Sequence, residues 1–354
     1  MKKLKLHQLG KIISGGTPST TNENYWDGEV IWITPKDLSK NKSRYIYNGE
    51  RNITQAGLEH SSAKLLPANS VLLSSRAPIG YLAIAGCELT TNQGFKSVIC
   101  DESIVLSEYL YYSLSTKIDD LISISSGSTF LELSKSSFEN FELNIHSIQK
   151  QQHIVNIIGS IDDLIECKFK IISNLYEYGM NLCKNLNGVE EIKLRDYINI
   201  STGKLDANKS VKDGKYPFFT CSENNLYIDD YAFDTEAILI SGNGSKLGYT
   251  NFYKGKFNAY QRTYVLTGND LFYVWFFSIK FNINKIIEQA RGSAVPYITK
   301  PMLENFSISI SDNIIENRDL NLNLQNIVYT ILNINNEIQK LTIIKQKYLN
   351  KFFG

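Results

Sequence analysis

The sequence lacks the features that mark secreted, membrane-spanning and metal-binding proteins. Its five cysteines are odd in number and show neither a C-x-x-C pair nor a metal-ligand spacing, so we expect free thiols in a reducing compartment. The basic N-terminal residues have no apolar segment behind them, and we expect no signal peptide. The most apolar run, Leu271–Ile279, is far shorter than the roughly 18 residues that span a bilayer. We therefore expect a cytoplasmic protein without a membrane partner.

An excess of charge of one sign is also missing. The chain has 37 Lys and Arg against 36 Asp and Glu, and its formal net charge is +1. No global basic field therefore indicates nucleic acid or membrane. This balance counts against a DNA-binding protein, unless a local basic face exists or other subunits supply phosphate contacts. The length of 354 residues allows two to three domains.

Catalytic constellations are largely missing. The Gly242–Gly248 segment lacks the G-K-[ST] end of a P-loop and the spacing of G-x-G-x-x-G, so we interpret it as a glycine turn after a strand. Asp213-Gly214-Lys215 has the D-x-K form of a nuclease site, but Asp-Gly before a strand is first of all a hairpin turn. The histidines form no H-E-x-x-H pattern. We find neither the N/D-P-P-[YF] tetrapeptide of amino-methyltransferases nor a serine nucleophile elbow.

What the sequence contains is a long internal repeat. Leu110–Ile145 aligns without a gap onto Trp275–Ile310. Earlier segments also recur, with insertions and deletions between them; Val71–Ser74, for example, matches Ile238–Ser241. A repeat of this length indicates a duplicated module and not the short period of a solenoid. Two similar modules suggest a protein that binds two similar targets at once, as a reader of a split target would.

Each module is predicted to mix strands and helices. Short apolar runs bounded by turn residues predict strands at Val30–Thr34, Ser70–Ser74 and Tyr81–Ala85. Apolar residues at helical spacing predict a helix over Ser107–Ile124 that ends near a glycine. The alternation over Ser137–Ile145 predicts a further strand.

A long helical pattern follows each module. Gln149–Leu186 would extend roughly 55 Å as a helix, and its apolar stripe needs a partner. The second long helix is the natural partner, which would give a coiled coil; alternatively, each helix packs on its own module. The stripes match each other at Ile154, Ile158, Ile161 and Ile165 in the first helix and at Ile327, Ile331, Ile334 and Ile338 in the second. We therefore predict an α+β chain: a first module at 1–147, a helix at 148–187, a second module at 188–315 and a helix at 316–354.

Two loops of the first module carry side chains that suit binding. Arg76 follows the apolar strand and Ser75, and an arginine on a rigid turn can be held at the angle that bidentate recognition of guanine or phosphate requires. An arginine paired with a nearby carboxylate is the open alternative. Asn92 and Gln93 offer amides that match adenine edges, and Lys96 offers a charge for phosphate.

The second module has polar loops at the matching places. One is Tyr260–Thr263, at the place that matches Thr91–Lys96, and the other is the donor-rich segment Ser241–Lys246. Gly-Ser turns with basic neighbours occur in both modules and suit phosphate contacts. The candidates in these loops and turns are Tyr260, Gln261 and Arg262, then Asn243, Ser245 and Lys246, and finally Ser128, Arg291 and Ser293.

Taken together, these segments resemble the specificity subunit of type I restriction-modification systems. The resemblance covers essentially the whole chain in the order of the family. It is carried by Lys5–Gly10 with Ser14–Ser19, Trp32–Asp37, Leu72–Gly80, Thr91–Phe95 and the Gly127 to Phe141 stretch. The second module departs from the pattern because Gly242–Gly248 replaces the Arg76–Gly80 turn. The sequence leaves open which second-module residue corresponds to Arg76.

The resemblance implies a reader without a catalytic centre. Members have two target-recognition domains related by duplication and joined by two long antiparallel helices, and each domain reads one half of a split, asymmetric double-stranded DNA site. Two modification subunits methylate adenine N6, and further subunits restrict and translocate DNA. S-adenosylmethionine, ATP and Mg²⁺ are accordingly expected on partner subunits, and no cofactor or metal on this chain. Lys36, in the Trp32–Asp37 segment, joins the candidate DNA-binding residues.

Two other functions remain as alternatives. The first is a stand-alone nuclease or methyltransferase with unrecognised motifs. The second is a scaffold whose modules bind polypeptides, a reading that the near-neutral charge favours slightly.

Overall fold

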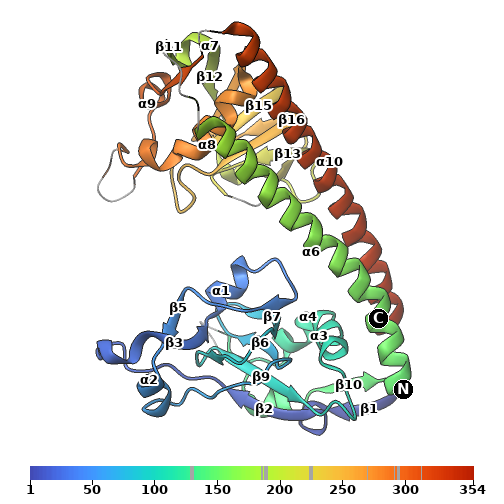
Figure 1. Cartoon of the computed structure of the whole chain (residues 1–354). Coiled ribbons are helices and arrows are strands. Elements are labelled where there is room, and N and C mark those ends of the chain that lie inside the picture. The colour runs from blue at the N-terminus through green and yellow to red at the C-terminus, as the bar shows by residue number, and fades with distance from the viewer. Residues whose placement is uncertain are drawn as a thin grey trace. The chain divides into compact units, whose positions relative to one another are not determined.

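The computed structural model describes residues 1–127, 131–184, 186, 190–222, 226–268, 270–290, 292, 296–311 and 313–354. The chain forms two compact units, and each contains part of both long helices (Figure 1). Unit 1 comprises Met1–Lys170 with Glu337–Gly354, and unit 2 comprises Ile171–Asn336. In the part of the chain that the structure describes, we find no helix whose length and hydropathy would allow it to span a bilayer.

Unit 1 contains three small sheets. The largest has the strand order β2-β9-β6-β7-β4, a second has β5-β3-β8, and β1 pairs with β10. The bounds are β1 Lys2–Lys5, β2 Gly10–Ser14, β3 Trp26–Ile33, α1 Pro35–Lys40, β4 Tyr45–Ile46, β5 Arg51–Ile53, α2 Gln55–Glu59, β6 Val71–Ser75, β7 Ile79–Ala85, β8 Thr90–Thr91, β9 Phe95–Cys100, α3 Ser107–Ser115, α4 Ile118–Ser123, α5 Lys135–Glu139 and β10 Glu142–Ile145. Every residue of β6 is buried, the apolar run Val71–Leu73 as well as Ser74 and Ser75 at its end.

Unit 2 contains one larger sheet and one strand pair. The sheet has the order β12-β17-β15-β16-β13-β14, and β11 pairs with β18. The bounds are β11 Glu190–Lys193, α7 Leu194–Tyr197, β12 Ile198–Thr202, β13 Tyr216–Phe219, β14 Leu226–Ile228, β15 Phe233–Ser241, β16 Thr250–Ala259, β17 Thr263–Gly268, α8 Phe272–Ile287, α9 Lys300–Glu304 and β18 Ser307–Ile310. Helix α8 contributes a run of buried aromatic side chains to the core.

The two units share one topology over five strands. The antiparallel series β2-β9-β6-β7 of unit 1 has the same order and directions as β12-β17-β15-β16 of unit 2. The next strand is parallel in both cases, β4 on β7 and β13 on β16. The pair β1–β10 likewise corresponds to β11–β18. The sequence repeat thus has a structural counterpart at the level of individual strands.

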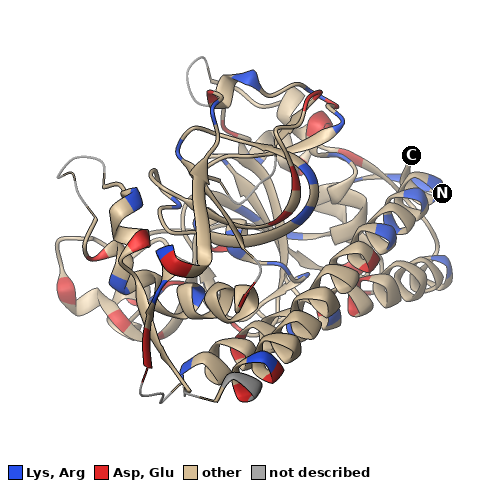
Figure 2. Cartoon of the chain, turned by 90° about the horizontal axis from the view of Figure 1, so that it is seen from above, with Lys and Arg blue, Asp and Glu red and all other residues tan. Residues whose placement is uncertain are grey.

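The long helices are α6, Ile148–Lys184, and α10, Ile314–Phe353, and they lie side by side in both Figures 1 and 2. In unit 1 the two helices run antiparallel, as two ion pairs show: Asp162 pairs with Lys345, and Lys168 pairs with Glu337. Each helix also packs on a module: Ile154 and Ile158 lie in the core of unit 1, and Ile327 and Ile331 in that of unit 2. Of the other matched positions, Ile165 and Ile338 are buried, whereas Ile161 and Ile334 are half-buried.

Two expected elements differ from the structure. The helix expected over Ser107–Ile124 is broken into α3 and α4, because the Ser115 and Thr116 hydroxyls donate to the carbonyls of Tyr112 and Ser113 at the end of α3. The strand expected over Ser137–Ile145 was wrong in its first part. That part belongs to α5, whose first turn is capped by the Ser134 hydroxyl accepting from the Ser137 N–H, and only β10 is a strand.

Candidate functional site

Three loop segments of unit 1 meet at the end of β6. The Ser75 N–H donates to the Gly94 carbonyl at 2.7 Å, and the Leu133 N–H donates to the Ser75 carbonyl at 2.9 Å. These bonds bring together the turn that begins at Arg76, the turn between β8 and β9, and the segment around Glu132. The loops are therefore fixed by backbone bonds to a buried strand, as a rigid binding site requires.

Two of the predicted cations converge on one carboxylate. Arg76 Nη1 lies 3.5 Å from Glu132 Oε2, and Lys96 Nζ lies 3.9 Å from Glu132 Oε1 and 3.4 Å from Ser75 Oγ. The Lys96 side chain is buried, and burial lowers its pKa; Glu132 opposes this shift, whereas Arg76 and Lys135 add to it. Arg76 is thus paired with a nearby carboxylate, which is the alternative that the sequence had left open. Two cations, Arg76 and Lys96, nevertheless share the one carboxylate of Glu132.

The two predicted amides lie beside this cluster. The Asn92 Oδ1 accepts from the Gly94 N–H at 2.9 Å, and the Thr17 hydroxyl donates to Gln93 Oε1. A Cβ on Gly94 would lie 3.4 Å from the Pro35 ring and 3.6 Å from Arg76 Cγ. The start of α1, the β8–β9 turn and the Arg76 turn are therefore neighbours.

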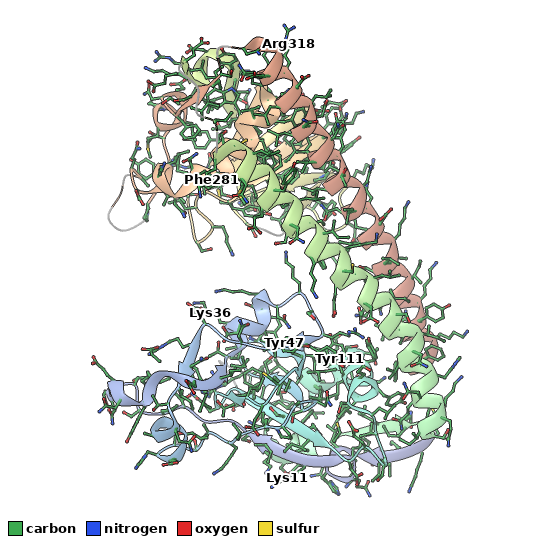
Figure 3. All side chains as sticks on the ribbon, viewed as in Figure 1. Lys11, Lys36, Tyr47, Tyr111, Phe281 and Arg318 are labelled. Atoms are coloured by element: carbon green, nitrogen blue, oxygen red, sulfur yellow. The ribbon has the colours of Figure 1, made fainter. Side chains whose placement is uncertain are left out.

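Lys36 follows Pro35 on α1 and is exposed (Figure 3). Its Nζ lies 2.8 Å from Glu50 Oε2, and the hydrogen bond to Glu50 raises the Lys36 pKa. This contact is at the surface, where an ion pair contributes little to stability. The structure thus places Lys36, Ser75, Arg76, Asn92, Gln93 and Lys96 in one region of unit 1.

Unit 2 repeats the backbone framework of this site. The Gly242 N–H donates to the Arg262 carbonyl at 2.8 Å, and the Ile298 N–H donates to the Gly242 carbonyl at 2.9 Å. These two bonds are the counterparts of the Ser75 bonds in unit 1. The bonds make three pairs of positions equivalent in the two units: Ser75 with Gly242, Gly94 with Arg262, and Leu133 with Ile298. The neighbouring residues are then equivalent too: Arg76 with Asn243, and Glu132 with Tyr297. The structure thereby identifies the counterpart of Arg76.

The side chains on this shared framework differ between the units. Asn243 and Tyr297 pair as an antiparallel bridge. Gly244 follows Asn243 with φ +81°, and no atom lies within 4 Å of the place where its Cβ would stand. The Gln261 amide donates to Asp206 Oδ1 at 2.7 Å, and the half-buried Tyr260 precedes it. Uncharged groups thus replace most of the charged cluster of unit 1. Arg262 and Ser245 are exposed, Lys246 is half-buried in the same loop, and the candidates Ser128, Arg291 and Ser293 lie outside the described residues.

Sequence reasoning missed Glu132, Tyr297 and Tyr264. Glu132 and Tyr297 occupy matching positions in the gap-free part of the repeat, so the alignment contained their equivalence but gave no reason to select them. Tyr264 takes the place of Lys96 in the second unit, and its hydroxyl donates to the Ile298 carbonyl at 2.9 Å. All three contact the site from strands or segments that are distant in sequence.

Polar clusters attach each module to a long helix. In unit 1 the buried Arg44 forms ion pairs with Glu108 on α3 and with Asp163 and Glu166 on α6, and its backbone N–H also donates to Glu166. In unit 2, Glu236 on β15 accepts from Tyr273 on α8 and from Tyr329 on α10. Both clusters join sheet-side residues to a helix within one unit.

The chain is similar in sequence to a known protein family. A family model described as "Type I restriction modification DNA specificity domain" matches residues 1–176 and 187–342. The chain is 32% identical to the type I restriction enzyme MjaIX specificity subunit of Methanocaldococcus jannaschii, with 99% of this chain and 92% of the relative covered. It is 47% identical to the EcoDI specificity subunit of Escherichia coli over 34% of this chain and 27% of that protein.

A solved structure has the same fold at low sequence identity. The crystal structure of the S subunit of a type I restriction-modification system from M. genitalium aligns with a TM-score of 0.57 and 17% identity, covering 100% of this chain and 96% of that one. The family match spans both units, and the repeated framework lies within both matched regions. The chain therefore belongs to the type I restriction-modification DNA specificity family.

Proposed function

We propose that this specificity subunit reads a split, asymmetric double-stranded DNA site, with one half-site bound by unit 1 and the other by unit 2. The observation that carries the proposal is the repeated backbone framework with different side chains at its equivalent positions. A shared framework places side chains alike against a duplex, and different side chains recognise different bases. We also infer that the two units arose by internal duplication, which the common strand order supports.

The charge distribution suits a reader that works inside a complex. Lys and Arg are interspersed with Asp and Glu along the chain in Figure 2, in keeping with the net charge of +1. Affinity for duplex DNA depends strongly on neutralised phosphates. We therefore expect weak binding by the isolated chain and tighter binding once partner subunits contribute phosphate contacts.

Helices α6 and α10 have the length of a spacer. With 37 residues, α6 measures roughly 55 Å, which exceeds the ~34 Å of one duplex turn. We propose that the two helices form an antiparallel coiled coil that sets the unread gap between the half-sites. Splitting the site adds the discrimination of both halves, because each mismatched base pair costs about 1–3 kcal/mol.

The same helices offer a surface to two methyltransferase subunits. Leu164, Ile171 and Tyr178 on α6 are 52%, 42% and 58% exposed, and their seven-residue spacing puts them on one face. Exposed apolar side chains in such a row are typical of a protein interface. In this proposal the partners hold S-adenosylmethionine and methylate adenine N6, and restriction subunits with ATP and Mg²⁺ join them in the cytoplasm.

Methylation mapping of the host genome, with and without this chain, tests the proposal. We expect a split adenine-methylated motif that vanishes on deletion, and an unchanged methylome would contradict the proposal. A methyltransferase or nuclease would instead act as the purified chain with S-adenosylmethionine and Mg²⁺. A polypeptide-binding scaffold would show no salt-dependent binding to duplex DNA when complexed with the methyltransferase.

A further inference from the structure

We propose that Arg76 and Asn243 each select one base pair of their half-site, Arg76 a guanine and Asn243 an adenine, and that Glu132 is the positioning residue for Arg76. This inference rests on the proposed DNA-reading function and names the base chemistry of the same site.

The two side chains start from the same point of the framework. Arg76 follows Ser75, and Asn243 follows Gly242. Each preceding residue donates one backbone hydrogen bond through its N–H and accepts another at its carbonyl. In each unit the donor to the preceding carbonyl, Leu133 or Ile298, comes from an equivalent segment of the repeat. If both units dock on DNA through this framework, the two side chains meet equivalent base pairs.

The Arg76 guanidinium has one edge bound and the other available. Its Nη1 contacts Glu132, whereas Nε and Nη2 contact no residue in the part of the chain that the structure describes. The side chain is 39% exposed, so this second edge reaches the surface. Two parallel N–H donors match the O6 and N7 acceptors of guanine in the major groove.

Glu132 connects Arg76 to a rigid support. Its second oxygen faces the Nζ of the buried Lys96, which also lies within reach of the Ser75 hydroxyl. Burial limits the movement of Lys96, and through Glu132 this restricts the guanidinium plane. A guanidinium held in one plane loses less entropy when it forms two bonds at once.

Asn243 has the complementary chemistry in unit 2. Asn243 is half-buried, its amide makes no hydrogen bond to a described residue, and no atom lies within 4 Å of the place where a Cβ on the next residue, Gly244, would stand. An asparagine amide can accept from N6 and donate to N7 of adenine. Tyr297 stands where unit 1 has Glu132, so no carboxylate is present at this position to hold an arginine.

Methylation mapping of the assembled system in cells carrying single variants tests the inference. We expect Arg76→Lys, which keeps the charge but loses the fork, to relax one G·C pair in one half of the motif. We expect Asn243→Ala to relax one A·T pair in the other half. Each loss should reduce discrimination at that pair by about tenfold to a hundredfold. Glu132→Gln should relax the same G·C pair as Arg76→Lys, but by less.

A matched control and an independent measurement separate the outcomes. Lys11→Gln removes one exposed charge from the edge strand β2 (Figure 3) and should leave the motif unchanged. The inference is overturned if Arg76→Lys leaves every position of the motif intact, relaxes a pair other than G·C, or acts on the same half as Asn243→Ala. If a variant abolishes methylation, competition with duplexes carrying single base-pair changes gives the same comparison. A wild-type methylome without a split motif would instead refute the proposed function itself.

Discussion

Replacing Arg44 with methionine should unfold unit 1 at a markedly lower temperature. Arg44 has a side chain only 7% exposed and pairs with three carboxylates, two of which lie on α6. A Cβ on Gly159 of α6 would lie 3.1 Å from Arg44 Nη1, so this glycine leaves room for the guanidinium. Methionine keeps much of the apolar volume and removes the charge and the donors.

The expected loss of stability in Arg44→Met follows from the exposure of the three carboxylates. Asp163 is 69% exposed, and water replaces its partner at little cost. Glu108 and Glu166 are 29% and 19% exposed and would lose their counter-charge in a partly desolvated place. Breaking a fully buried pair costs about 3–5 kcal/mol, so we expect about 2–3 kcal/mol here. For a unit of roughly 150–250 residues this lowers Tm by about 4–12 °C.

Thermal unfolding of the full chain, with hydrogen exchange to locate the change, measures this effect. We expect the amides of α3 and the first half of α6 to lose protection, while those of β15 and α8 keep theirs. Lys36→Met breaks an exposed pair with Glu50 and should leave Tm unchanged. The double variant Arg44→Met with Glu166→Leu should recover part of the loss, because it removes a stranded charge. An Arg44→Met chain that melts with the wild type would refute this reasoning.

Three further predictions concern unit 2. Burial lowers the pKa of Lys280 from 10.5 to about 8. Between these pH values the unfolded chain binds more protons than the folded chain, so the stability of unit 2 rises with pH there. Lys280→Met should therefore stabilise unit 2 at pH 7 in thermal melts, and this gain should fade towards pH 10.5. A Cβ on Gly179 of α6 would lie 2.3 Å from Phe277 Cε1 on α8. Gly179→Leu should therefore destabilise unit 2 by about 1–3 kcal/mol in denaturant titrations. The control Ser173→Leu, at an exposed position of α6, should not destabilise it. Burial raises the pKa of Glu236, but hydrogen bonds from Lys254, Tyr273 and Tyr329 outweigh it and lower the pKa. Glu236→Gln should thus destabilise unit 2 at neutral pH. Its difference from wild type should shrink below pH 4.5 and vanish once the pH falls below the lowered pKa of the folded state, while a constant difference would contradict this.

The sequence predicted the framework well because the framework is encoded locally. Continuous apolar runs identified β6 and β7, and the regular spacing of isoleucines located α6 to within two residues at each end. The expectation for Ser137–Ile145 failed because a single capping serine, Ser134, starts a helix within an alternating pattern. Local chemistry at one position outweighed the periodicity of the segment.

The partners within the site are not encoded locally, and sequence reasoning did not find them. Glu132 meets Arg76 across 56 residues, and Glu166 meets Arg44 across 122. The counterpart of Arg76 was hidden for a different reason. The turn after β15 differs in length from that after β6, so alignment alone gives no register, and only the backbone bonds of Ser75 and Gly242 supply one.

Because the end of α10 belongs to unit 1, this unit can be completed only after the whole chain has been synthesised. Residues 337–354 belong to unit 1, where Leu349 is buried in the core and the Phe353 ring lies 5.1 Å from that of Tyr109. A ribosome makes these residues only after it has finished unit 2. The first module to emerge thus waits for its last aromatic side chains, and a nascent chain arrested within α10 would expose apolar surface to chaperones and proteases.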